Sequence, residues 1–499
     1  MESLLPTRHH PKIRFAKNPL CDDTLATHDL VMVLAPSNAT RALLRNCPRG
    51  SELLVQLERP NQPPIPDWLR LSATEHGGAL MLIFVKNPTT AFERLQFAAK
   101  AWKEACSFAP SSIALTTLGF DAADSHVLLN AHLAAILAGS SQLPSFKQQQ
   151  SPSALKNITL LQCSASNFAH TLATQSGNHL ARWLTALPPN TLHCASYRQA
   201  LAQLAEREGW QAEFMNLSAL KKHKAGAFLA VSRANAHQHA GIMRLQYRSN
   251  SRASQKRRKI TLVGKGICFD TGGINLKTHK SMYDMHTDMQ GSAVALGTLL
   301  ALTHLKVPID VECWLALTEN EIGPNAYRPQ EVITAANGVT IQVVHSDAEG
   351  RMVLADTLAL AARHKPDLMI DFATLTGACI GALTERMSGA FSNRPALRDS
   401  IELAGRISGE RVWSFPMDSD FDTDLDSPIA DIMQCTMDNK GDHILAARFL
   451  NRFVPEQIPW VHIDLSSANK SGGLAHIPSE ITGFGVRWAV EFITHHSFN

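Results

Sequence analysis

Residues 264–273 read Gly-Lys-Gly-Ile-Cys-Phe-Asp-Thr-Gly-Gly, and residues 345–351 read His-Ser-Asp-Ala-Glu-Gly-Arg. Each stretch follows an apolar segment of strand length and sets charged side chains among glycines. A single carboxylate beside a glycine carries little information. Several carboxylates, backed by lysine and arginine after two expected strands, indicate a catalytic metal site.

The segments around these stretches alternate between apolar strands and long helices. Strands are predicted at 260–263, 311–317, 340–344, 368–372 and 460–463, and helices at 290–305, 352–364, 444–453 and 486–495. This alternation indicates a mostly parallel sheet covered by helices on both faces. Ligands of such sheets bind at the carboxyl ends of the strands. We therefore expect Lys265 and Asp270 to meet Asp347 and Glu349 at one edge.

The first 150 residues show a similar but smaller pattern. Short apolar runs at 30–34, 79–85 and 112–118 predict strands, and segments 90–106 and 125–137 predict helices. This pattern predicts a small N-terminal α/β domain at 1–150. Residues 139–155 have the Ser, Gln and Pro content of a linker. A linker and connecting helix are expected at 151–190, with a strand at 158–163 and a helix at 166–184, followed by a catalytic domain at 191–499.

The composition narrows the class of protein. The 499 residues are 45% hydrophobic and 18% charged, which is typical of a globular protein with a full core. The net charge of +3 is too mild to indicate nucleic acid as an obligate partner. Nine cysteines without a CxxC pair indicate reduced thiols. No apolar run could span a bilayer and no secretory signal is visible, so we expect a cytoplasmic protein without a membrane partner.

Each acidic residue has an ordinary explanation when it is considered alone. Asp347 and Glu349 are two residues apart, so an extended backbone would point both to one side, where they repel unless protonated or bridged by cations. They also fit an acidic helix start. Asp288 precedes an apolar helix and fits an N-cap.

The two lysines add to the case for metal ions, although each of them, taken alone, is better explained as an ordinary surface residue. Lys265 lies between two glycines, and a partly buried lysine must find partners or lose its charge. Neighbouring divalent cations would lower its pKa and let the neutral amine coordinate. Lys277 could stay charged and point at a reacting carbonyl oxygen. More acids than one ion needs, together with the lack of a His ligand motif, suggest two ions such as Mn²⁺ or Zn²⁺.

At these residues the chain resembles the leucyl aminopeptidase family, the cytosolic dinuclear-metal aminopeptidases. Residues 263–273 resemble the first metal segment of that family, and residues 346–351 resemble its most characteristic motif. Segments 326–329 and 371–378 also match, and the resemblance covers roughly residues 165–499. It implies an α/β fold, with a C-terminal, mostly parallel sheet sandwiched by helices and a smaller, macro-like N-terminal α/β domain.

The resemblance also implies the two sets of metal ligands. One tightly held cation would be bound by Lys265, Asp270, Asp288 and Glu349. A second, more exchangeable cation would be bound by Asp270, Asp347 and Glu349. A hydroxide bridging the two would attack the first peptide bond of a peptide with a free N-terminus.

Further roles follow from the same resemblance. Lys277 would stabilise the oxyanion, and Arg351 would hold a bicarbonate ion that acts as the general base. The pocket for the first side chain would be bordered by Met285, Thr374 and Gly377. Members of the family are typically homohexamers.

Several positions depart from the family pattern. His345-Ser346 replaces the usual Asn-Thr pair, His286 and Thr278 stand where Lys and Pro are frequent, and residues 464–467 differ near the pocket. None of these changes removes a ligand. We therefore expect a metal-dependent aminopeptidase that removes leucine-like residues. The alternative is a DNA-binding or regulatory protein on the same scaffold, for which the clustered Arg41, Arg45 and Arg49 are the supporting feature.

Overall fold

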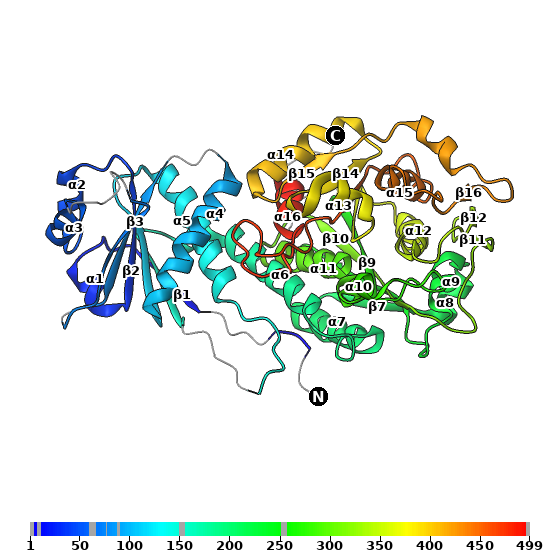
Figure 1. Cartoon of the computed structure of the whole chain (residues 1–499), viewed down its shortest axis with the longest axis horizontal. Coiled ribbons are helices and arrows are strands. Elements are labelled where there is room, and N and C mark those ends of the chain that lie inside the picture. Colours follow the sequence, from blue (N-terminus) through cyan, green and yellow to red (C-terminus); the bar gives the residue numbers. More distant parts are fainter. Residues whose placement is uncertain are drawn as a thin grey trace. The chain divides into compact units, whose positions relative to one another are not determined.

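The computed structural model describes residues 4–6, 11–58, 66–75, 77–86, 90–148, 155–250 and 257–495 (Figure 1). The chain divides into two compact units. The smaller unit comprises Arg8–Gln175 and Gly472–Ser479, and the larger comprises Met1–Thr7, Ser176–Ser471 and Glu480–Asn499. The centre of the predicted linker, residues 149–154, lies outside the described residues.

The smaller unit is built on a six-stranded sheet in the order β1-β6-β5-β2-β4-β3. All neighbouring pairs are parallel except β3 and β4. The strands are β1 (Lys12–Ala16), β2 (Leu30–Pro36), β3 (Trp68–Leu71), β4 (Ala79–Val85), β5 (Ser112–Thr117) and β6 (Asn157–Leu161). The helices are α1 (Asp22–Thr27), α2 (Arg41–Arg45), α3 (Gly50–Leu57), α4 (Ala91–Ala105) and α5 (Ala122–Ser140). The predicted strands and helices of residues 1–150 are confirmed.

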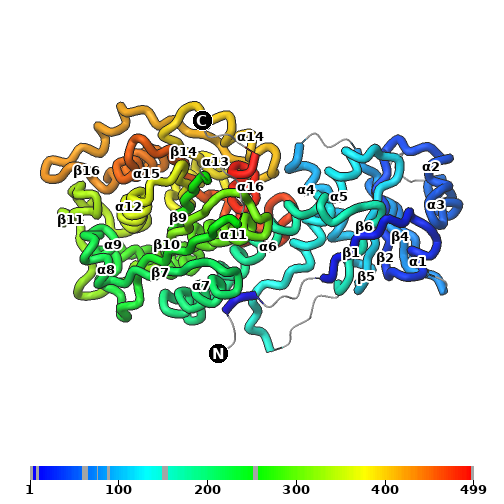
Figure 2. Tube along the Cα trace, turned by 180° about the vertical axis from the view of Figure 1, so that it is seen from behind, coloured from blue at the N-terminus to red at the C-terminus, as the bar shows by residue number. Residues whose placement is uncertain are grey.

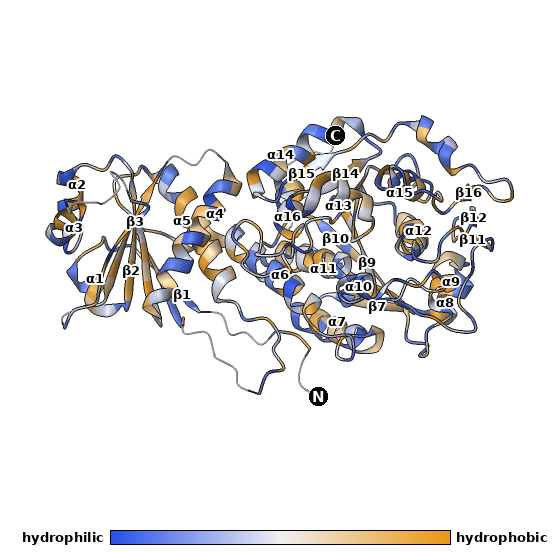
Figure 3. Ribbon diagram, viewed as in Figure 1, coloured by the Kyte–Doolittle hydropathy of each residue, from blue (hydrophilic) through white to orange (hydrophobic). Residues whose placement is uncertain are grey.

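Alternate residues of β2 supply the two cores of this unit. Met32 packs in one cluster with Trp102 of α4 and Leu133 of α5. Val33 packs in another with Leu44 of α2 and Leu53 of α3. Because successive side chains of a strand point to opposite faces, a strand covered on both sides must be apolar throughout. Figure 3 shows β2 in the orange of hydrophobic residues.

The arginines that supported DNA binding are partly neutralised. Arg41 lies 3.0 Å from Glu58, and Arg49 lies 2.7 Å from Glu52. The segment is therefore less basic than its arginines alone indicate.

The larger unit contains an eight-stranded sheet in the order β15-β14-β17-β13-β9-β10-β8-β7 (Figures 1 and 2). Its centre, from β17 to β10, is parallel. β14 pairs antiparallel with β17, β8 pairs antiparallel with β10, and β7 pairs antiparallel with β8. The strands are β7 (Gln211–Asn216), β8 (Gly241–Tyr247), β9 (Lys259–Asp270), β10 (Asp310–Asn320), β13 (Leu368–Ala373), β14 (Ser388–Ser392), β15 (Val412–Ser414) and β17 (Trp460–Asp464). The predicted α/β class with a mostly parallel central sheet is confirmed.

Helices cover both faces of this sheet. They are α7 (Cys194–Glu208), α8 (Leu217–Lys222), α9 (Gly226–Ser232), α10 (His279–Met282), α11 (Gln290–His304), α12 (Glu349–Ala362), α13 (Gly377–Leu383), α14 (Arg398–Ser408), α15 (Asp442–Asn451) and α16 (Val486–His495), and α6 (Ala169–Thr185) begins in the smaller unit. A Cβ on Gly264 would meet Ser292 of α11, whereas Lys265 lies against Gly350 of α12. The two helices therefore lie on opposite faces of β9. Among the described residues, no helix has the length and hydropathy needed to cross a bilayer.

Two details of the predicted sheet are wrong. First, β9 does not stop at Val263 but continues through Lys265 to Asp270, because β10 pairs with it as far as Asp270 despite its glycines, whereas the pairing with β13 ends at Gly264. Second, β12 (Thr340–Gln342) is not part of the main sheet. It pairs instead with β11 (Val332–Thr334) and β16 (Ile432–Met433) in a separate three-stranded sheet.

Candidate metal centre

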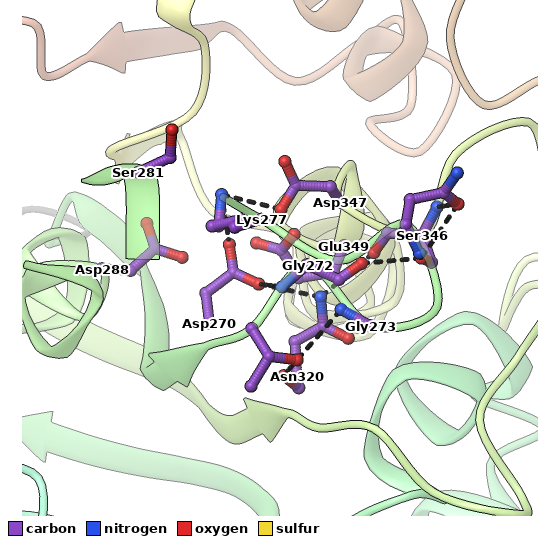
Figure 4. A network of polar contacts seen from close by, with 12 residues as sticks. Asp270, Gly272, Gly273, Lys277, Ser281, Asp288, Asn320, Ser346, Asp347 and Glu349 are labelled. Atoms are coloured by element: carbon purple, nitrogen blue, oxygen red, sulfur yellow. Dashed lines mark hydrogen bonds and ion pairs between the residues drawn. The ribbon is translucent and has the colours of Figure 1, made fainter. Parts of the chain in front are cut away.

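Four carboxylates and two lysines come together at the end of β9. Figure 4 shows the four carboxylates with Lys277. Lys265 and Asp270 belong to β9, Asp288 follows the 3₁₀ turn Met285–Thr287, and Glu349 is the first residue of α12. They line one cavity of about 400 Å³ together with Lys277, Asp347, Met285, Thr374 and Gly377. The structure therefore brings together nine of the ten predicted site residues, and only Arg351 is absent from the lining.

The geometry around Asp347 and Glu349 differs from the expected extended segment. Asp347 lies in a turn and Glu349 begins α12, three residues earlier than predicted. Both side chains still reach the cavity, because the helix start turns the second one back toward β9. Asp270, Asp347 and Glu349 each offer an oxygen within 4.8 Å of the others. This spacing suits a shared cation.

The lysines are held by the carboxylates. Lys265 is only 3% exposed, and its Nζ lies 2.7 Å from Asp288 Oδ1 and 3.1 Å from Glu349 Oε1. Lys277 lies between two other acids, with its Nζ 3.0 Å from Asp270 Oδ2 and 2.7 Å from Asp347 Oδ1 (Figure 4). Two ammonium groups cannot balance four ionised carboxylates, so the site favours additional positive charge.

The electrostatics of the carboxylates point the same way. Burial, reinforced by the charge of Asp270, raises the pKa of Glu349 well above its usual range. Burial also raises the pKa of Asp288, to about 6, against the opposing effect of Lys265. Asp288 Oδ2 and Glu349 Oε2 are buried without a hydrogen-bond partner among the described residues. Oxygen donors of this kind, beside an amine, fit Mn²⁺ or Zn²⁺.

Several neighbours that position the acids were not predicted from the sequence. Asn320, the register partner of Asp270 on β10, donates its Nδ2 hydrogen to Asp270 Oδ1 over 2.9 Å and to the Ser346 carbonyl over 3.1 Å. The Tyr327 hydroxyl donates to the same carbonyl at 2.6 Å. Tyr327 belongs to segment 326–329, which resembles the family, and that resemblance is the feature of the sequence that could have placed Tyr327 at the site. Thr374 also has a second role, since its Oγ1 donates to Asp288 Oδ1 over 2.7 Å.

Ser346, which replaces the usual Thr of the family pattern, has a structural role at the site. Its Oγ donates to the Gly272 carbonyl at 2.7 Å and accepts from the Asn275 N–H at 2.8 Å. The hydroxyl thus ties the turn after Asp270 to the turn before Asp347. Gly272 is required in that turn, because its φ is +85° and a Cβ would lie 2.9 Å from Asp347 Oδ1.

Arg351 points away from the acidic cavity. Its guanidinium donates to both carboxylate oxygens of Asp442, at 2.9 and 2.7 Å, and to the Gln434 carbonyl at 3.1 Å. Two helical residues beyond Glu349, a side chain emerges on a different side of α12, since each residue turns the helix by about 100°. The bicarbonate role of Arg351 therefore stays a prediction.

Gly350 offers a direct test of how the lysine is positioned. A Cβ at this position would lie 2.6 Å from Lys265 Cε and 2.9 Å from its Nζ. We expect Gly350→Ala to preserve the helix, displace the ammonium group and weaken Mn²⁺ binding by roughly 10–100-fold. Titration calorimetry would measure the affinity. Gly381→Ala is the control, because a Cβ there would meet no atom within 4 Å. Equal Mn²⁺ affinity of the two variants would contradict the expectation.

Comparisons with known proteins identify relatives of this chain. The model of the catalytic domain of the cytosol aminopeptidase family matches residues 179–490. A probable cytosol aminopeptidase of Rhodopseudomonas palustris is 40% identical over 319 residues, which cover 64% of this chain and 62% of that protein. A Synechococcus protein of the same description is 38% identical, with 68% and 70% covered. The match thus spans less than two thirds of the first of these relatives.

Solved structures agree with the sequence comparisons. The bottromycin maturation enzyme BotP in complex with Mn has a TM-score of 0.79 and 27% identity, covering 93% of this chain and 98% of that one. A variant of tomato leucine aminopeptidase has a TM-score of 0.84 and 24% identity, covering 99% of both chains, and shows the fold alone. More than half of the chain matches the family model, in the region that carries the acidic cavity. The chain belongs to the cytosol aminopeptidase family.

Proposed function

We propose that this protein is a metal-dependent aminopeptidase that hydrolyses the N-terminal residue from peptides. The observation that carries the proposal is the cluster of four buried or half-buried carboxylates and two lysines in one cavity of the family's catalytic domain. Hydrolysis of an unactivated amide at neutral pH requires a strong nucleophile, and metal ions generate one from water.

We assign the tightly held cation to Lys265, Asp270, Asp288 and Glu349, and the exchangeable cation to Asp270, Asp347 and Glu349. When bound, the two ions would supply a water of lowered pKa and polarise the substrate carbonyl. Lys265 would have to release a proton to act as a ligand, and bound cations favour that release. Mn²⁺ is the first candidate because BotP is described in complex with Mn.

Lys277 suits the role of an oxyanion donor. Burial by itself would lower its pKa, but the charges of Asp270, Glu349 and Asp347 raise it above the usual lysine range. The ammonium group therefore stays protonated at neutral pH in the cation-free site. Bound cations would neutralise the acids and leave its N–H groups available for the developing negative charge of the tetrahedral state.

The cavity also suits a substrate with an apolar first residue. Met285, Thr374 and Gly377 lie in its lining beside apolar Leu375 and Ile380. An aliphatic side chain would gain about 25 cal/mol for each Å² removed from water there. We therefore propose leucine-like residues as the preferred substrates, and a homohexamer as the assembly by family resemblance.

Chelation tests the function directly. The fully chelated protein should lose leucyl amide hydrolysis and regain it with Mn²⁺ or Zn²⁺, because the proposed nucleophile is a water activated by the bound cations. Activity on a panel of aminoacyl amides would be measured beside elemental analysis of the same samples. N-acetyl leucyl amide is the matched control and should remain uncleaved, because it lacks the free amine. Full activity of a protein shown to contain no metal would refute the proposal.

A further inference from the structure

A second cavity in the larger unit holds two thiols and a carboxylate. Its volume is about 570 Å³, and none of its lining residues lines the acidic cavity. Cys194 is the first residue of α7, Cys268 lies near the end of β9, and Glu319 lies near the end of β10. The two Sγ atoms and a Glu319 oxygen all lie within 4.8 Å of one another.

A β-bulge brings Cys268 and Glu319 together. The pairing of β9 with β10 runs from Ile267 opposite Thr318 to Asp270 opposite Asn320. Glu319 alone therefore opposes two residues of β9, one of which is Cys268. Bulges redirect side chains, and this one sends Glu319 to the second cavity while Asn320 meets Asp270 in the first.

The carboxylate is oriented before any ligand arrives. Glu319 Oε1 accepts from the Cys194 backbone N–H at 3.0 Å, and Oε2 accepts from Asn235 Nδ2 at 3.1 Å. Both of these donors are neutral, so they fix the position of the carboxylate without balancing its charge. A carboxylate that keeps its charge in this position, beside two thiols, favours the binding of a cation there.

Imidazoles stand at the rim of the same cavity. His193, His237 and His239 are exposed and line it, and the rings of the last two are 5.8 Å apart. No imidazole nitrogen belongs to the close group of ligand atoms, so a metal held by the three inner side chains would leave its fourth position to water or, after a side-chain rotation, to one of these imidazoles. Two sulfurs, one oxygen and one nitrogen or water form a donor set that zinc accepts in tetrahedral geometry.

We propose that Cys194, Cys268 and Glu319 form a second metal site that binds one thiophilic divalent cation of the zinc class. Thiolates select such ions. The carboxylate oxygens and the amine of the acidic cavity, in contrast, suit Mn²⁺ as well as Zn²⁺. The ion displaces the thiol protons when it binds. It links the start of α7 to the ends of β9 and β10, so its role is to stabilise the strand ends that carry Asp270 and Asn320.

Cobalt provides a probe that separates the two sites. Co²⁺ bound by thiolates has an intense sulfur-to-metal absorption band in the near ultraviolet, and the lining of the acidic cavity contains no cysteine. The whole chain, chelated and kept reduced, should develop this band on titration with Co²⁺ and lose it on addition of Zn²⁺. The absence of the band from the reduced protein would overturn the proposal.

Variants show whether the band belongs to these residues. Cys194→Ser should abolish it, and Glu319→Gln, which keeps both thiols, should weaken Co²⁺ binding at least roughly tenfold. Cys106→Ser removes an exposed thiol of the smaller unit and is the control that should keep the band. Circular dichroism would verify that each variant is folded. A band unchanged in both Cys194→Ser and Glu319→Gln would also overturn the proposal.

Discussion

Replacing Glu349 with glutamine should abolish peptide hydrolysis and remove both cations of the acidic cavity. The amide has the size of the carboxylate but only one oxygen, and it carries no charge to attract a metal. A water without bound cations loses the effect that lowers its pKa, so the turnover number should fall on the order of a thousandfold or more. Leucyl amide turnover and elemental analysis would be measured on the same preparation.

This loss should occur without unfolding. Burial and the charge of Asp270 already raise the pKa of Glu349, so ionising it in the cation-free site costs free energy. Glutamine removes that cost, and the melting temperature of the chelated variant should equal or exceed that of the chelated parent. Glu385→Gln is the matched control, since Glu385 is an exposed carboxylate in the lining of the same cavity. Retention of two cations and of full turnover by Glu349→Gln would refute the assignment of this ligand.

Replacing Lys277 with alanine should give the second largest effect, with a different pattern. We expect turnover to fall by roughly two to three orders of magnitude, as on loss of an oxyanion donor. The bound cations should remain, because the assigned ligands are intact. The Michaelis constant should change little if the ammonium acts on the transition state rather than on the bound substrate.

The design separates this catalytic role from a structural one. In the cation-free site Lys277 neutralises Asp270 and Asp347, and a merely structural lysine would become dispensable once cations take over that task. Turnover would therefore be measured at saturating Mn²⁺. Lys280→Ala, which removes an exposed lysine three residues along the chain, should retain full turnover. Normal turnover of the metal-saturated Lys277→Ala variant would show that Lys277 is not the oxyanion donor.

Much of the fold could be predicted because its signals are local. The strands predicted at 30–34 and 79–85 and the helix predicted at 486–495 agree with β2, β4 and α16 to within two residues. A strand buried on both faces must be apolar throughout, and this property is visible in a single sequence. The extent of β9 is not visible in the sequence, because its glycines are tolerated only through hydrogen bonds from strands distant in the chain.

The sequence by itself determined the kind of chemistry: which acids and lysines occur, in what order, and in which family. Only the tertiary structure decided how these groups meet. It pairs Lys265 with Asp288 and Glu349 and places Asn320 against Asp270. It also turns Arg351 toward Asp442 and brings the free thiols of Cys194 and Cys268, from two different elements, close together. The physical reason is that residue type and periodicity act over a few positions. Contacts between side chains depend instead on strand order, register and bulges, which the whole chain sets together.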